Sequence, residues 1–211
     1  MRTAEMGLDD MTIDPGLNFF GNRVWFDLRI EDLKAYVHTM DEMLIQRETM
    51  LRGLPEEDDS EPFPHLLHSS MIVAAVSLLE AEFKRFASTI QEAEHLRLGF
   101  GDIRGSLLKR FRLYVEQVAS VDLRIEEDLW QDVSAIVDLR HYFAHGVEAQ
   151  EGKEIPGAVV SLQQRRGVMK IEDARLIVGK ETSLFAIEAI GRFLSQAYTV
   201  ATDRYYLPDG A

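Results

Sequence analysis

The segment of residues 65–94 constrains the fold more than any other part of the chain. Its centre, MIVAAVSLLEAEFKRF, is apolar along one helical side and polar along the other. A long amphipathic helix of this kind is stable only when other elements cover its apolar side. The rest of the chain must therefore supply packing partners for it.

Helical spacing recurs in four further segments, which can supply those partners. In residues 27–52 the apolar side chains that repeat at this spacing are Leu33, Tyr36, Val37, Met40, Met43 and Leu44. Further helices are predicted over 103–118, 126–146 and 183–203, and Gly146 is a suitable residue to end the second of these. The predicted fold is mainly α: a helical bundle in a single domain over residues 27–211. Residues 1–26 are predicted to be an irregular segment, because Pro15, Gly16 and Gly21 break helices.

One stretch before the last helix departs from the helical pattern. GAVVSLQQRRGVMKIEDARLIV carries β-branched residues on both sides of a central RRG. Such runs around a glycine-containing turn are typical of a hairpin. The sequence therefore predicts a small β-hairpin before the C-terminal helix.

Composition and termini indicate a soluble cytoplasmic protein. The chain has no cysteine, which excludes disulfides, a thiolate metal site and a cysteine nucleophile. Its N-terminus, MRTAEMGLDDMTIDPG, has acidic residues and no apolar run, unlike a signal peptide. We also expect no apolar window close to the roughly 18 residues that a membrane helix needs.

The net charge of −13 argues against broad, non-specific binding of nucleic acid, which needs basic surface. The charge is unevenly distributed, however. Residues 97–112 carry five basic side chains and only one acidic side chain, Asp102, a local net charge of +4. One local basic patch is therefore compatible with the acidic chain.

Two charged residues fall on the apolar sides of their predicted helices. With each residue turning the helix by about 100°, Arg140 lies about 20° from Val133, in the middle of the apolar stripe of residues 126–146. Glu80 lies about 40° from Val76, inside the stripe of residues 65–94. A charge in such a place must be paired, or must line an interface or pocket. The sequence predicts a Glu80–Arg140 ion pair, which is either part of a functional site or a buried pair without chemistry.

Two histidines follow Arg140 in the stretch AIVDLRHYFAHGVE. His145 lies about 140° from Arg140 on an ideal helix, so the two side chains point apart within one subunit. It also lies in the last helical turn, where the helix dipole favours the charged imidazole and suits it to acid–base work. His141 and His145 share one helical edge at a spacing that can bind a divalent metal, but that alternative would need a third ligand.

RHYFAH resembles the R-x4-6-H signature of HEPN domains, which are all-α modules. In that family the motif lies near the end of a late helix, a polar residue usually follows the arginine, and an acidic residue often accompanies it on an earlier helix. Here Arg140 and His145 match the motif, His141 is the polar residue, and Glu80 fits the acidic position. The resemblance covers roughly residues 65–146.

The resemblance implies a metal-independent endoribonuclease without cofactors that works as a homodimer, with two motifs meeting in one cleft. Arg140 and His145 would be catalytic, and His141 and Glu80 supporting. The candidate RNA-binding residues are Arg104, Lys109, Arg110, Arg112, Arg165 and Arg166. The implied setting is a toxin–antitoxin or phage-defence system, with an antitoxin or inhibitor protein as a further partner. The alternative is a non-catalytic HEPN module that dimerises or binds a partner.

Overall fold

The computed structural model describes residues 14–51, 63–144, 154–172 and 175–206. In these ranges the helices are α1 (Pro15–Leu51), α2 (Phe63–Ala93), α3 (Leu107–Leu113), α4 (Glu127–Phe143), α5 (Gly157–Arg166) and α6 (Lys180–Tyr205). A short antiparallel hairpin, β1 (Lys170–Glu172) and β2 (Arg175–Ile177), immediately precedes α6. The predicted mainly α fold with a small hairpin before the last helix is therefore confirmed.

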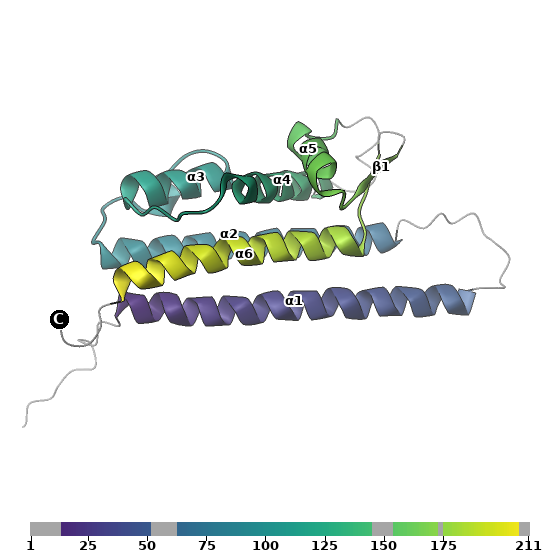
Figure 1. Ribbon diagram of the computed structural model, residues 1–211, viewed down its shortest axis with the longest axis horizontal. Coiled ribbons are helices and arrows are strands. Elements are labelled where there is room, and N and C mark those ends of the chain that lie inside the picture. Colours follow the sequence, from purple (N-terminus) through teal and green to yellow (C-terminus); the bar gives the residue numbers. More distant parts are fainter. Residues whose placement is uncertain (1–13, 52–62, 145–153, 173–174, 207–211) are drawn as a thin grey trace, which may run out of the picture.

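The helices form three layers (Figure 1). α1 runs along one side of the molecule, α2 and α6 lie side by side in the middle, and α3, α4 and α5 form the opposite layer. α1 and α4 are therefore separated by the α2–α6 layer, and their outer faces lie on opposite sides of the bundle.

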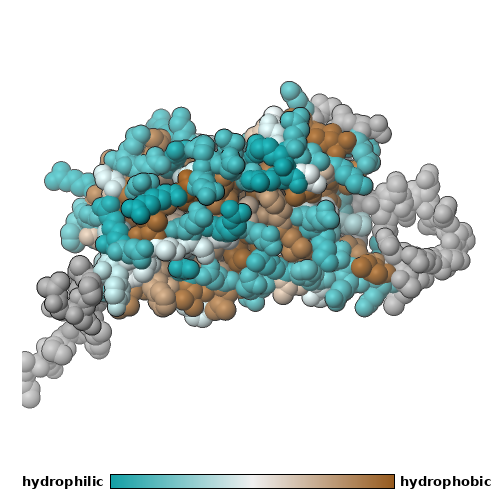
Figure 2. Space-filling view, in the orientation of Figure 1, coloured by the Kyte–Doolittle hydropathy of each residue, from teal (hydrophilic) through white to brown (hydrophobic). Residues whose placement is uncertain are grey.

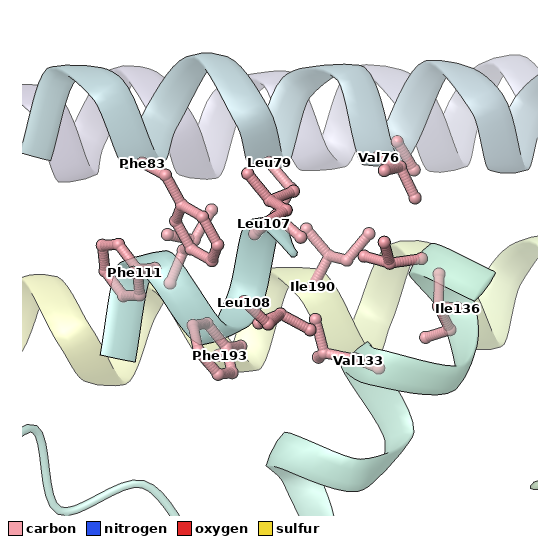
Figure 3. Close-up of a cluster of buried hydrophobic side chains, with 14 of the residues drawn as sticks. Val76, Leu79, Phe83, Leu107, Leu108, Phe111, Val133, Ile136, Ile190 and Phe193 are labelled. Carbon is pink, nitrogen blue, oxygen red and sulfur yellow. The ribbon is translucent and has the colours of Figure 1, made fainter. Parts of the chain in front are cut away.

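The core lies where α2 and α6 meet α3 and α4 (Figure 3). Its centre is aromatic: the Phe83 and Phe111 rings stack with centroids 3.7 Å apart, and Phe193 packs against both. Val76, Leu79, Val133, Ile136 and Ile190 continue the cluster, and each is fully buried. These are the apolar positions that helical spacing picks out in α2 and α4, so the sequence pattern directs the packing.

α1 begins earlier than predicted, at Pro15. Asp14 precedes it and its Oδ1 accepts the backbone N–H of Gly16 at 2.7 Å, which is helix capping. Proline at the first helical position has the right backbone angle and needs no N–H donor. The irregular segment predicted for residues 1–26 is thus wrong for residues 15–26, and residues 1–13 lie outside the described ranges.

The hairpin lies further along the chain than predicted. Residues 157–166, GAVVSLQQRR, form α5, and Gly167 ends this helix in the left-handed conformation with φ of 65°. Two arginines in the last turn followed by glycine are signals of a helix end, and RRG is therefore a helix cap rather than a hairpin turn. The strands pair Lys170 with Ile177 and Glu172 with Arg175.

The expectation that no segment reaches membrane-spanning length is also wrong. Residues 64–93 of α2 are long and apolar enough to cross a membrane by length and composition alone. Half of the apolar window is buried inside the bundle, however, as in a core helix of a soluble protein. The visible surface of the bundle is mostly hydrophilic, with brown apolar areas along the lower edge formed by α1 (Figure 2).

Candidate functional site

Arg140 lies on the buried side of α4, as its position in the apolar stripe predicts. Val133 and Ile136, which share that side, are fully buried, and Arg140 itself is partly buried. Its Nε is shielded from solvent and has no hydrogen-bond partner. Among the described residues Arg140 also forms no ion pair. The guanidinium is therefore a partly buried cation that no anionic side chain of the described residues pairs with.

Glu80 does not supply that anion. It is partly buried on α2, and among the described residues it makes neither a hydrogen bond nor an ion pair. The predicted Glu80–Arg140 ion pair is therefore wrong for the single chain. α2 is covered by α1, α4 and α6 on different sides, so an angle measured from Val76 alone does not say which neighbour a side chain meets.

The carboxylate that α2 does bury is Glu82, whose side chain is fully enclosed. It accepts the Tyr198 hydroxyl at 2.7 Å, Arg85 Nη1 at 2.6 Å and Arg29 Nη1 at 3.2 Å. These donors come from α6, α2 and α1, so the cluster ties three helices together. Burial and the neighbouring carboxylate raise the pKa of Tyr198, which keeps its hydroxyl protonated as a donor. The cluster has every charge satisfied and is structural.

His141 is exposed on α4, and Asp138 lies beside it. Burial raises the pKa of the Asp138 carboxyl, and the nearby His141 opposes that shift. The two are three residues apart, a spacing that brings side chains together on a helix. This i, i+3 spacing could have identified Asp138 from the sequence, where we did not single it out.

His145 and Gly146 lie outside the described residues. α4 ends at Phe143, and Ala144 donates its backbone N–H to the Arg140 carbonyl at 2.9 Å. The helical hydrogen bonds thus continue to the last residue before His145. The angle between Arg140 and His145 expected from an ideal helix stays a prediction.

Two further histidines lie at this end of the bundle, and the sequence analysis did not assign them to the site. The His65 ring meets the edge of Phe143 with centroids 5.3 Å apart, and its Nδ1 accepts the Val178 N–H at 3.3 Å. His68 is buried and its Nδ1 lies 3.2 Å from the Ser183 hydroxyl. Burial lowers the pKa of both imidazoles, and His68 lowers that of His65 further. The end of α4 therefore packs against His65, and burial favours the neutral form of both histidines.

Arg165 and Arg166, two of the predicted RNA-binding residues, are engaged by a buried acid. Asp132 on α4 accepts Arg165 Nη2 at 2.9 Å and Arg166 Nη2 at 2.7 Å, and its side chain is 4% exposed. The carboxylate raises the pKa of Arg166. These two arginines hold α5 against α4, and the Asp132 carboxylate balances one of their two positive charges.

The other four RNA-binding candidates divide into two pairs. Arg112 forms ion pairs with Glu116 at 3.0 Å and Glu127 at 3.2 Å, and Arg110 stacks over the Phe100 ring. Arg104 and Lys109 are exposed and have no ion-pair or hydrogen-bond partner among the described residues. Among the described residues, the basic patch predicted from residues 97–112 therefore has three solvent-facing cations without an ion pair, Arg97, Arg104 and Lys109.

The structure separates this patch from Arg140. Arg112 pairs with Glu127, the first residue of α4, and Arg140 lies thirteen residues further along the same helix. At about 1.5 Å per residue, roughly 20 Å of helix separates the two. Within one chain this patch and Arg140 are therefore not brought together.

The described residues contain no group of three or more histidine or acidic side chains placed to hold a metal ion. His145, which the metal alternative requires, lies outside these residues, so that alternative stays open. No protein-family model, curated protein or solved structure matches this chain.

Proposed function

We propose that this protein is a metal-independent endoribonuclease of the HEPN type, in which two copies of the Arg140–His145 motif form one site in a homodimer. The observation that carries the proposal is the unpaired Arg140: its Nε is buried without a partner, and no described carboxylate neutralises it. A partly buried guanidinium is costly unless an anion pairs with it. A phosphodiester is such an anion, and guanidinium geometry matches its two oxygens.

In the proposed reaction the ribose 2′-oxygen attacks the adjacent phosphorus, and the bond to the 5′-oxygen breaks. A histidine accepts the 2′-hydroxyl proton or donates a proton to the departing oxygen, and His145 has that role here. Arg140 stabilises the additional negative charge on the phosphate oxygens in the transition state. The products are a 2′,3′-cyclic phosphate and a 5′-hydroxyl, and the proposed reaction needs no metal or cofactor.

His141 and Asp138 support this chemistry as a pair. The exposed His141 imidazole lies beside the Asp138 carboxyl and next to Arg140 in the sequence, so it can contact a phosphate bound at Arg140. Glu80 has no ion pair or hydrogen bond to another described residue, and its supporting role would be to contact RNA or the second subunit.

Bound RNA would extend from the Arg140 site to the cations near α3. Arg104 and Lys109 are cations near α3 without an ion pair to another described residue. Arg112 of the same region pairs with Glu127 at the start of α4, roughly 20 Å of helix from Arg140. We therefore expect that they bind backbone phosphates remote from the cut. The acidic remainder of the chain limits binding to such local contacts, which fits a toxin or phage-defence effector held by an inhibitor protein.

The test is cleavage of single-stranded RNA in EDTA by wild type, Arg140→Ala and His145→Ala. Both variants should lose at least about a hundredfold in rate, because each removes a transition-state contact. Arg192→Ala is the matched control, since Arg192 is an exposed arginine on α6 without an ion pair to another described residue. Cleavage by all three variants at the wild-type rate would refute the proposal, and activity that disappears only on chelation would favour the metal alternative.

A second candidate, a non-catalytic HEPN module that dimerises or binds a partner, is favoured by a different observation. Arg112, Arg165 and Arg166 are paired with carboxylates, so half of the candidate RNA-binding cations are already used inside the chain. This candidate predicts no cleavage and a dimer that dissociates in Arg140→Ala. Light scattering of that variant separates the two: an intact dimer that has lost cleavage supports the nuclease.

A further inference from the structure

The outer face of α1 carries an apolar stripe that no described residue of the chain covers. Leu17, Phe20, Val24 and Leu28 are 54%, 54%, 43% and 54% exposed. At about 100° per residue all four lie within about 40° of Val24. We call these four residues the outer stripe.

α1 is thus apolar on two sides in its first half. The side opposite the outer stripe carries Phe19, Phe26 and Ile30, which are buried against the bundle. A surface helix normally has one apolar side and a polar outer side. Trp25, at the edge of the outer stripe, is 65% exposed, which is unusual for the largest apolar side chain. The arrangement indicates a helix that packs on both sides.

The second half of α1 does not continue the stripe. The same outer side there carries Glu31, His38 and Glu42, all exposed. The outer stripe itself therefore ends near residue 28, and the exposed apolar side chains of the second half of α1, Tyr36, Met43 and Ile45, lie about 60° or more from its centre. An occupant of the outer stripe therefore needs to cover only the first half of the helix.

We propose that the outer stripe is the contact surface for a second copy of this chain, with the two α1 helices crossing antiparallel about a two-fold axis near residues 21–24. In that arrangement the apolar first halves of the two α1 helices contact each other, and their second halves, which carry Glu31 and Glu42, extend away from the contact in opposite directions. A parallel pair would place Glu31 against Glu31 and Glu42 against Glu42, and like charges in contact are unfavourable. The charge pattern therefore selects a self-complementary antiparallel contact.

The residues around the proposed axis permit close approach. Gly21 lies beside the stripe, and a Cβ built on it meets no atom within 4 Å, so a neighbouring helix can come close there. Arg23 and Asp27 flank the stripe on the α6 side, with side chains 37% and 47% exposed. With the axis near residues 21–24, Arg23 of one copy lies close to Arg23 of the other, and each is balanced by Asp27 of its own chain at 3.6 Å.

A pocket of about 490 Å³ closes the α6 end of the stripe, lined by Leu17, Phe20, Thr202, Asp203 and Tyr206. Thr202 Oγ1 is buried and without a hydrogen-bond partner there. With the axis near residues 21–24, Leu28 of a second copy lies opposite Leu17 and can enter this pocket. The stripe then supplies both the protruding side chain and the pocket that receives it.

The outer stripe and Trp25 together form a contiguous apolar patch, since each of these five side chains is more than 40% exposed. α1 lies on the opposite side of the α2–α6 layer from α4 (Figure 1), so a contact through the outer stripe is distinct from any contact made at Arg140.

Engineered cysteines test the geometry, because the chain has no native cysteine to confuse the result. Gly21→Cys should form an intermolecular disulfide on mild oxidation. Thr39→Cys is the matched control: Thr39 is exposed and lies eighteen residues, five full turns, further along the same side of α1. In the antiparallel contact the two Thr39→Cys positions are about 50 Å apart and should not crosslink. Equal crosslinking of both variants would indicate a parallel pair and overturn the proposal.

The second measurement is the mass in solution by light scattering. Leu28→Glu should weaken association at least about tenfold and lower the mass, whereas Leu98→Glu, which alters a side chain 51% exposed outside α1, should not. Arg140→Ala, in contrast, should leave the Gly21→Cys crosslink intact. A wild-type monomer at 100 µM overturns the proposal, and if acrylamide also fails to quench Trp25 in that monomer, the stripe is covered by another segment of the same chain.

Discussion

Glu82 and Arg140 both carry a charge next to the core, but they differ in how that charge is paired. Glu82 is fully enclosed and receives three donors from three helices. Arg140 is partly buried, with Nε shielded and no partner among the described residues. A satisfied buried charge fixes how helices pack, and removing one partner leaves the others unpaired. An unsatisfied one lowers stability and is available to a ligand or a second subunit.

Asp132 lies between these extremes on the same helix as Arg140. Its carboxylate is nearly buried, yet its two arginine partners on α5 remain about one-third exposed. Glu82 is therefore fully paired, Asp132 is paired with partly exposed arginines, and Arg140 is unpaired among the described residues. This order predicts how much the free energy of unfolding falls when each charge is removed.

The largest effect is expected for Glu82→Ala. The substitution leaves the Tyr198 hydroxyl without an acceptor in the core and opens a cavity between α1, α2 and α6. Arg29 and Arg85 are 47% and 37% exposed and can turn toward water, which reduces the loss. We expect a decrease of about 3 kcal/mol in the free energy of unfolding, measured with urea.

Glu80→Ala is the control for that measurement, since Glu80 lies two residues away on α2 and is unpaired within the described chain. It should change stability by less than about 0.5 kcal/mol. Equal losses for Glu80→Ala and Glu82→Ala would contradict the assignment of Glu82 as the structural acid.

Asp132→Ala should have the next largest effect, about 1 to 2 kcal/mol, because α5 loses both ion pairs to α4. The substitution also releases the charges of Arg165 and Arg166 at the surface. Binding of a single-stranded RNA should then strengthen and become more sensitive to salt, which filter binding at two ionic strengths measures. Unchanged RNA binding would show that these arginines do not face the path of the RNA.

The sequence predicts the helices well because their apolar spacing is regular, and it predicts Arg140 for the same reason. The errors have local physical causes. Pro15 was interpreted as a helix breaker, although proline after Asp14 is suited to the first helical position. RRG was interpreted as a hairpin turn, although it caps α5. The burial of Glu82 does not follow from its angle to Val76, because α1, α4 and α6 contact α2 on different sides and more than one side of the helix is buried.

Acidic pH should weaken the Arg140 end of the bundle before the Glu82 cluster. The pKa values of His65 and His68 are lowered from an ordinary value of 6.5, so the folded chain binds fewer protons than the unfolded chain just below that pH. Stability from the neutral histidines is therefore present above about 6.5 and is lost as the pH falls through the folded pKa values. Protonated His65 also cannot accept the Val178 N–H.

Thermal unfolding between pH 7.5 and 5 measures this effect. We expect a fall in melting temperature in wild type and a smaller fall in a His65→Gln, His68→Gln double variant. The charged groups facing His68 include Asp41 and Lys180, which form an ion pair with each other at 2.8 Å. An equal fall in melting temperature in both proteins would show that other titrating groups cause the pH dependence.

Among the three charges of Glu82, Asp132 and Arg140, the smallest effect on stability, and the sharpest test of the comparison, is expected for Arg140→Met. Methionine keeps the length and apolar stem of arginine on the buried side of α4, while the unpaired charge disappears. Replacing a poorly compensated buried charge by an apolar side chain is often neutral or stabilising. We therefore expect urea unfolding within about 1 kcal/mol of wild type, together with loss of RNA cleavage if the nuclease proposal holds. A loss of more than about 2 kcal/mol would instead place Arg140 with Glu82, as a charge that the fold itself requires.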